Sequence, residues 1–95
     1  MSFWKKLFGS GNTDTANKDK VVREADHKGF RIAAMPYAEA GQYQVAGRIT
    51  KEADGVTREH RFVRADRFAS LEDAADVALM KARQMIDQQG ERIFD

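Results

Sequence analysis

The stretch Gly41–Glu52, GQYQVAGRITKE, decides the fold because its side chains alternate in character. Every second position is apolar or glycine: Tyr43, Val45, Gly47 and Ile49. Polar residues fill most of the positions between them: Gln42, Gln44, Arg48 and Thr50. A period of two is typical of a β-strand with one buried side and one side facing solvent. The segment therefore predicts a central strand with Arg48 in the middle of its exposed side.

Turn signals on both sides of this strand predict its neighbours. Lys28-Gly29 predicts a two-residue turn that pairs His27 with Phe30 and Asp26 with Arg31. We expect Ala38–Gly41 to close the next hairpin, with three resulting pairs: Ala34 with Val45, Ile32 with Gly47, and Phe30 with Ile49. Asp54-Gly55 is a strong hairpin signal that predicts two more pairs: Gly47 with Phe62, and Ile49 with His60. In these registers the apolar residues share one face of the sheet.

A helix is predicted after the strands. Ser70 and Asp73 resemble a capping box, and Gly90 is a natural end. One apolar stripe has helical spacing: Leu71, Ala74, Ala75, Ala78, Leu79, Ala82, Met85 and Ile86. Ile93 and Phe94 then offer a hydrophobic clasp, or a patch for another chain. The predicted fold is α+β, a four-stranded antiparallel meander packed on one C-terminal helix.

Composition limits the function classes. The 95 residues allow one small domain, and a net charge of +1 provides no global field that attracts nucleic acid or an anionic membrane. Cysteine is absent, which excludes disulfides and thiolate chemistry and fits a cytoplasmic protein. No apolar run approaches the ~20 residues of a spanning helix, and no signal peptide is apparent.

The chain divides into three zones. Residues 1–8 form a short amphipathic segment, with apolar Phe3, Trp4, Leu7 and Phe8 opposite Lys5 and Lys6. Such a segment either docks weakly on a membrane or partner, or is a frayed terminus. Docking would place the protein peripherally at the inner membrane. Residues 9–20 lack large apolar side chains and predict a flexible polar linker. Residues 21–95 form the single domain.

The predicted registers also arrange the exposed face of the sheet. A first row contains Asp26, Arg31, Arg48 and Arg61. A second row contains Ala33, Ala46 and Val63, and a third contains Val22, Met35 and Gln44. Three arginines therefore lie beside a small apolar patch.

Three interpretations of this face are open. Acidic neighbours could simply neutralise the arginines on a solvated surface, where ion pairs contribute little. A second copy could cover an apolar self-association patch: Val22, Ala33, Met35, Ala46 and Val63. Alternatively, Arg31, Arg48 and Arg61 could bind the phosphates of DNA, although Tyr37 is the only aromatic candidate for base stacking.

The sequence contains no recognisable motif for catalysis or metal binding. The two histidines, His27 and His60, fall at a turn and at a core margin, where structural roles are more common. Without cysteine or a cluster of histidine and glutamate, no metal site is expected. Ser70 is explained as a helix cap, and no glycine-rich phosphate loop precedes a helix. We expect a non-enzyme with no catalytic residues, no cofactor and no small-molecule substrate.

Four segments together resemble one family: KGFRI, GQYQVAGRITKE, REHRFVRAD and ALMKARQMIDQQG. The domain is similar to the short bacterial HlyU-type proteins, which are named for a haemolysin transcriptional activator, and the MSFWKKLFG start is similar too. The resemblance implies a small bacterial regulator of transcription. The pattern contains one long helix and no helix–turn–helix pair for the major groove.

Two function hypotheses follow. The first is a regulatory binding module that acts in transcription through the arginines. The second is a protein-interaction or membrane-proximal adaptor that docks through residues 1–8. A homodimer is compatible with both.

Overall fold

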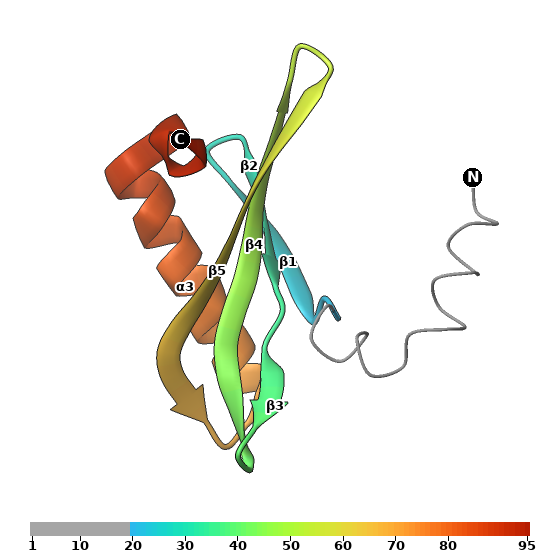
Figure 1. Cartoon of the computed structure of the whole chain (residues 1–95), viewed down its shortest axis with the longest axis vertical. Coiled ribbons are helices and arrows are strands. Elements are labelled where there is room, and N and C mark those ends of the chain that lie inside the picture. Colours follow the sequence, from blue (N-terminus) through green and yellow to red (C-terminus); the bar gives the residue numbers. More distant parts are fainter. Residues whose placement is uncertain (1–19) are drawn as a thin grey trace, which may run out of the picture.

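The computed structural model describes residues 20–95, in which one antiparallel sheet packs against one α-helix (Figure 1). The strands are β1 (Arg23–His27), β2 (Phe30–Ala34), β3 (Tyr37–Glu39), β4 (Gln42–Ala53) and β5 (Val56–Phe68). The helix α3 (Leu71–Gln89) leads into a 3-10 helix, η1 (Gly90–Phe94). The predicted α+β class is confirmed, with the helix C-terminal to the strands.

The sheet has five strands where the sequence predicted four, because the second predicted strand is split. Met35 still donates its N–H to the carbonyl of Ala46 at 2.9 Å. Pro36, whose ring fixes φ and which has no N–H, separates the two segments. The chain resumes pairing with β4 as the short strand β3.

The predicted register between β2 and β4 is wrong by two residues. Ile32 lies opposite Ile49, and Ala34 lies opposite Gly47. The connecting turn is Ala40-Gly41 alone, with φ of 53° and 81°, rather than the four residues Ala38–Gly41. Positive φ at both positions is the type I′ geometry that suits a two-residue hairpin. A shift of two residues keeps each side chain on its predicted face.

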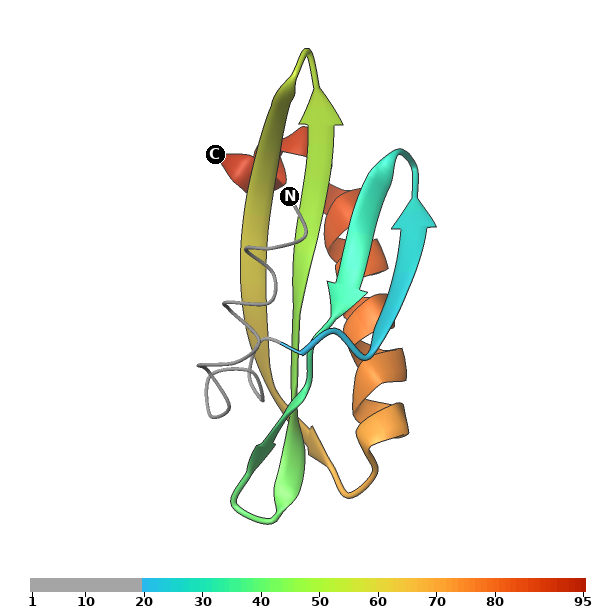
Figure 2. The ribbon, with the colours of Figure 1, turned by 90° about the vertical axis from the view of Figure 1, so that its right-hand side faces the viewer.

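The other two hairpins have the predicted registers. β1 pairs with β2 so that Asp26 lies opposite Arg31, and β4 pairs with β5 so that Gly47 lies opposite Phe62. β2 and β3 pair with one side of β4, and β5 pairs with the other side. β1 and β5 therefore lie at the sheet edges (Figure 2). Between Gln44 and Ala46 the register shifts, and β5 residues 64–66 bulge opposite Val45.

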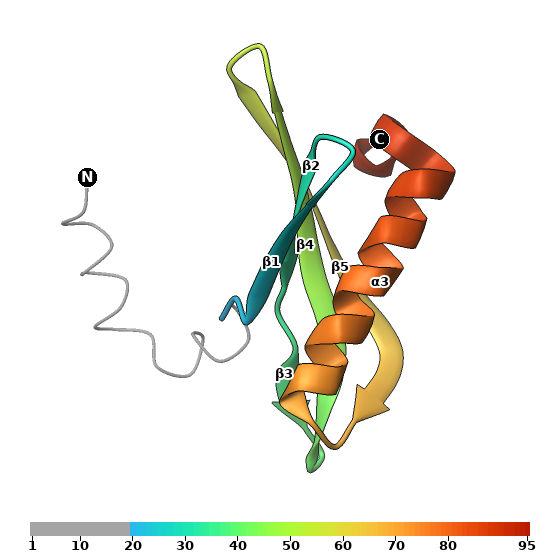
Figure 3. The ribbon, with the colours of Figure 1, turned by 180° about the vertical axis from the view of Figure 1, so that it is seen from behind.

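The hydrophobic core lies between α3 and one face of the sheet (Figure 3). Four helix alanines are fully buried there: Ala74, Ala75, Ala78 and Ala82. These small side chains let the helix lie close to Ile32, Val45 and Ile49, which are also fully buried. The predicted cap is confirmed, because the Ser70 hydroxyl accepts a hydrogen bond from the Asp73 N–H at 3.2 Å.

The C-terminal residues form the predicted clasp. Ile93 is buried, and the Phe94 ring stacks on Phe30 with 6.0 Å between centroids. Above this clasp β4 and β5 continue past the start of β2, and residues 51–58 project as a hairpin arm (Figure 1).

Candidate anion-binding site on the sheet

The face of the sheet away from α3, which we call the outer face, carries three rows of side chains. The register gives one row of Asp26, Arg31, Thr50 and Glu59. The next row contains Glu24, Ala33, Arg48 and Arg61. A third row contains Met35, Ala46 and Val63. The predicted single row of arginines is therefore wrong for Arg31, because the corrected β2 register moves it opposite Thr50.

Arg31 is neutralised by its own neighbours. Its Nη1 lies 3.3 Å from Glu24 Oε1, and its Nε lies 3.3 Å from Asp26 Oδ1. Two carboxylates thus satisfy one guanidinium on the β1–β2 hairpin. The structure separates this arginine from the other two by row, and from Arg48 also by charge balance.

Arg48 and Arg61 lie directly opposite each other on β4 and β5, as predicted. Arg61 donates from Nε to Glu59 Oε2 at 2.9 Å. Arg48 is half-buried, and its side chain has no ion-pair or hydrogen-bond partner among residues 20–95. Like charges at directly opposed positions repel each other. An anion between these two guanidinium groups would relieve that repulsion, and their planar donor forks suit an oxyanion such as phosphate.

The predicted self-association patch is largely closed to solvent within one chain. Ala33, Met35 and Ala46 are buried, although they lie on the outer face. Val22 is half-buried and packs against the hydrophobic core. Val63 is the exposed member, with 61% of its surface accessible. Any contact with a second copy at this face would therefore centre on Val63 and β5.

The amphipathic residues Phe3, Trp4, Lys5, Lys6, Leu7 and Phe8 lie outside the described residues. So does all of the predicted linker except Lys20.

Sequence reasoning missed a polar network at the β5 bulge. Gln44 is buried, and its side-chain amide donates to the carbonyls of Arg64 and Asp66. Its carbonyl Oε1 accepts from Arg67 Nε at 2.8 Å. The bulge frees these strand carbonyls from the ladder, and the Gln44 side chain satisfies them. The period-two pattern could not reveal this role, because it marked Gln44 only as a solvent-facing residue.

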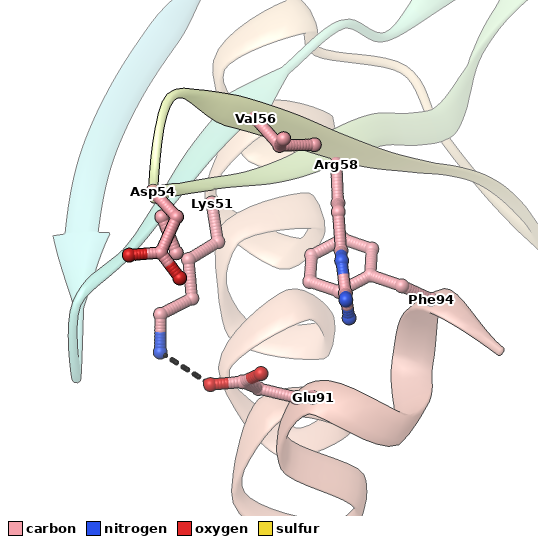
Figure 4. A pocket seen from close by; sticks show the side chains of 7 residues that line it. Lys51, Asp54, Val56, Arg58, Glu91 and Phe94 are labelled. Carbon is pink, nitrogen blue, oxygen red and sulfur yellow. Dashed lines mark hydrogen bonds and ion pairs between the residues drawn. The ribbon is translucent and has the colours of Figure 1, made fainter.

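A second unpredicted feature joins the arm to η1 (Figure 4). Lys51 lies over the Phe30 ring, with its Nζ 4.7 Å from the ring centroid. Lys51 also forms an ion pair with Glu91 at 2.9 Å, drawn as a dashed line in Figure 4. The hydrogen bond from Lys51 holds the pKa of Glu91 below its usual range, and the nearby charge of Arg58 acts in the same direction. A hollow of about 250 Å³ lies beside this pair, with Arg58 and Phe94 in its lining. The ion pair holds the arm to the C-terminal clasp.

The ionisable side chains of the first turn form structural contacts with α3. His27 and Lys28 both contact Asp87 Oδ1, at 2.9 and 2.8 Å, which ties the first turn to α3. The hydrogen bonds from Lys28 and then His27 lower the pKa of Asp87. In residues 20–95 no three histidine, cysteine, aspartate or glutamate side chains form a group suited to a metal ion. No helix in the same range is long and apolar enough to cross a bilayer.

The family model described as transcriptional activator HlyU matches residues 2–94. The resemblance carried by the four sequence segments is thereby confirmed. No curated protein and no solved structure matches the chain.

Proposed function

The chain belongs to the HlyU family, and we propose that it is a small non-enzymatic regulatory module whose Arg48–Arg61 pair binds a phosphate group of DNA. The family description, that of a transcriptional activator, supports a role in transcription. The single observation that carries the site is Arg48, a half-buried arginine without a partner among residues 20–95, directly opposite a second arginine.

The geometry favours contact with the DNA backbone over reading of bases. The apolar side of α3 packs on the sheet, and residues 20–95 contain no second α-helix to complete a helix–turn–helix. Phosphate contacts position a protein on the duplex and carry no direct sequence information. The outer face also carries Glu24, Asp26 and Glu59, whose carboxylates partly offset the charge of its arginines. Binding through this pair alone is expected to be weak and sensitive to salt.

Fluorescence anisotropy of a labelled duplex at low salt tests this proposal. Arg48→Glu should weaken binding to unrelated duplexes by a similar factor, because a phosphate contact is lost and a repulsive charge is added. Arg83→Glu is the matched control, since Arg83 is exposed on α3, on the other side of the molecule. Equal affinity of the Arg48→Glu variant and the wild type would reject the site.

A second candidate function is docking of residues 1–8 on a membrane or protein partner. The observation that favours it is the family match, which begins at residue 2 and so includes this amphipathic segment. Co-sedimentation with anionic lipid vesicles should retain the full chain and lose a chain that starts at Lys20. Equal sedimentation of the two chains would remove membrane docking.

A further inference from the structure

Among residues 20–95, the backbone of strand β5 pairs on one side only. It runs for 13 residues, Val56–Phe68, and pairs only with β4. Among residues 20–95, no backbone group outside this ladder bonds to β5. A long open edge presents unpaired N–H and C=O groups that can pair with another strand.

The regular part of this edge is its first eight residues, Val56–Val63. Residues 64–66 bulge, which disturbs the outer ladder beyond Val63. All eight residues are exposed except His60, which is half-buried, and Phe62, which is buried. Two of the exposed residues are large and apolar: Val56 is 59% exposed and Val63 is 61% exposed. The strand contains no proline that would block pairing.

A second copy of this chain matches the edge in one register. When two copies pair antiparallel around a two-fold axis, residues opposite each other must lie on the same face. Within Val56–Val63, four registers pair at least five residues of each copy. These registers differ in the residue that lies on the two-fold axis, which is Arg58, Glu59, His60 or Arg61. Three of these four registers set two like charges directly opposite each other, which is unfavourable.

The register centred on His60 avoids this repulsion. It places Glu59 of each copy opposite Arg61 of the other, so two pairs of opposite charge flank the axis. It also places the exposed Val63 of each copy opposite Thr57 of the other. We propose that the chain forms a two-fold homodimer by antiparallel pairing of the β5 edges, centred on His60. The interface joins the two sheets into one, and it does not depend on the proposed DNA contact.

Cysteine cross-linking reads the register directly, because the chain contains no cysteine of its own. Directly opposed residues in an antiparallel pair have Cβ atoms about 4.5–5.5 Å apart, near the range for a disulfide. Single substitutions Arg58→Cys, Glu59→Cys, His60→Cys and Arg61→Cys each test one of the four registers under mild oxidation. We expect the fastest cross-linking for His60→Cys. Val56→Cys is the control, since it lies outside the paired residues in this register.

A charge swap tests the same interface without cysteine. Analytical ultracentrifugation of the full chain measures its average mass in solution. As protein concentration increases, this mass should rise from the 10.7 kDa of the monomer toward twice that value, because a single strand pair makes a small, reversible interface. Glu59→Arg should abolish this change, and adding Arg61→Glu should restore it. Glu72→Arg makes the same change of charge at an exposed position of α3 and should have no effect. A wild-type chain that stays monomeric throughout, or faster cross-linking at another position, would overturn the proposal.

Discussion

At the residue scale, Gly47 lets an aromatic ring cross the centre of the sheet. A Cβ atom at this position would lie 2.6 Å from Phe62 Cζ and 2.7 Å from the Ala33 carbonyl oxygen. The ring could shift, but the carbonyl belongs to the β2 backbone and cannot. Gly47→Ala should therefore destabilise the fold by about 1–3 kcal/mol, the usual cost of overpacking. Urea unfolding measures this free energy, and an unchanged midpoint would contradict the close approach.

Ala40 carries backbone strain that another residue would relieve. Its φ of 53° lies in the left-handed region, where alanine is disfavoured and asparagine is tolerated. Ala40→Asn creates the Asn-Gly sequence preferred in type I′ turns and should stabilise the protein by about 0.5–1 kcal/mol. Ala38→Asn is the control in thermal unfolding, since Ala38 is exposed in the regular strand β3 and should give no gain.

At the element scale, the arm is held to η1 by the Lys51–Glu91 ion pair. The pKa of Glu91 is lowered in the fold, so the stabilisation is present above the usual carboxyl range of about pH 4.3 and is lost as pH falls below it. Glu91→Gln should be less stable than the wild type at neutral pH, and the difference should shrink on acidification. Both groups face solvent, so added salt should reduce the effect.

Unfolding at several pH values measures this difference. Glu39→Gln is the control, because Glu39 is exposed on β3 and has no described ion-pair partner among residues 20–95. A difference between Glu91→Gln and the wild type that stays constant down to pH 3 would contradict the role of the ion pair.

The elements also explain how much the sequence could predict. Lys28-Gly29 and Asp54-Gly55 carry ordinary turn signals, so their hairpins, and with them the Arg48–Arg61 pair, were predicted correctly. Ala40-Gly41 adopts the same backbone, but the prediction closed this hairpin with the four residues Ala38–Gly41, and the register of Arg31 was wrong in consequence. Burial of Met35 and Ala46 could not be predicted, because alternation alone assigns them to the exposed face.

At the scale of the whole molecule, α3 covers one face of the sheet, and the two proposed contact surfaces lie on the outer face and along the β5 edge. The outer face presents the Arg48–Arg61 pair, and the β5 edge presents unpaired backbone. In the proposed dimer these surfaces join, so that one continuous outer face carries two arginine pairs. A module with a net charge of only +1 would then contact DNA at two points without a broad basic surface.

We propose that Arg48 contacts a phosphate of DNA, and the salt dependence of DNA binding counts such contacts. The logarithm of the binding constant falls linearly with the logarithm of salt concentration, and each lost phosphate contact reduces the slope by about 1. The magnitude of this slope should be about 1 less for Arg48→Ala than for the wild type. It should be unchanged for Arg83→Ala. Equal slopes for Arg48→Ala and the wild type, or no binding by the wild type at low salt, would contradict the claim.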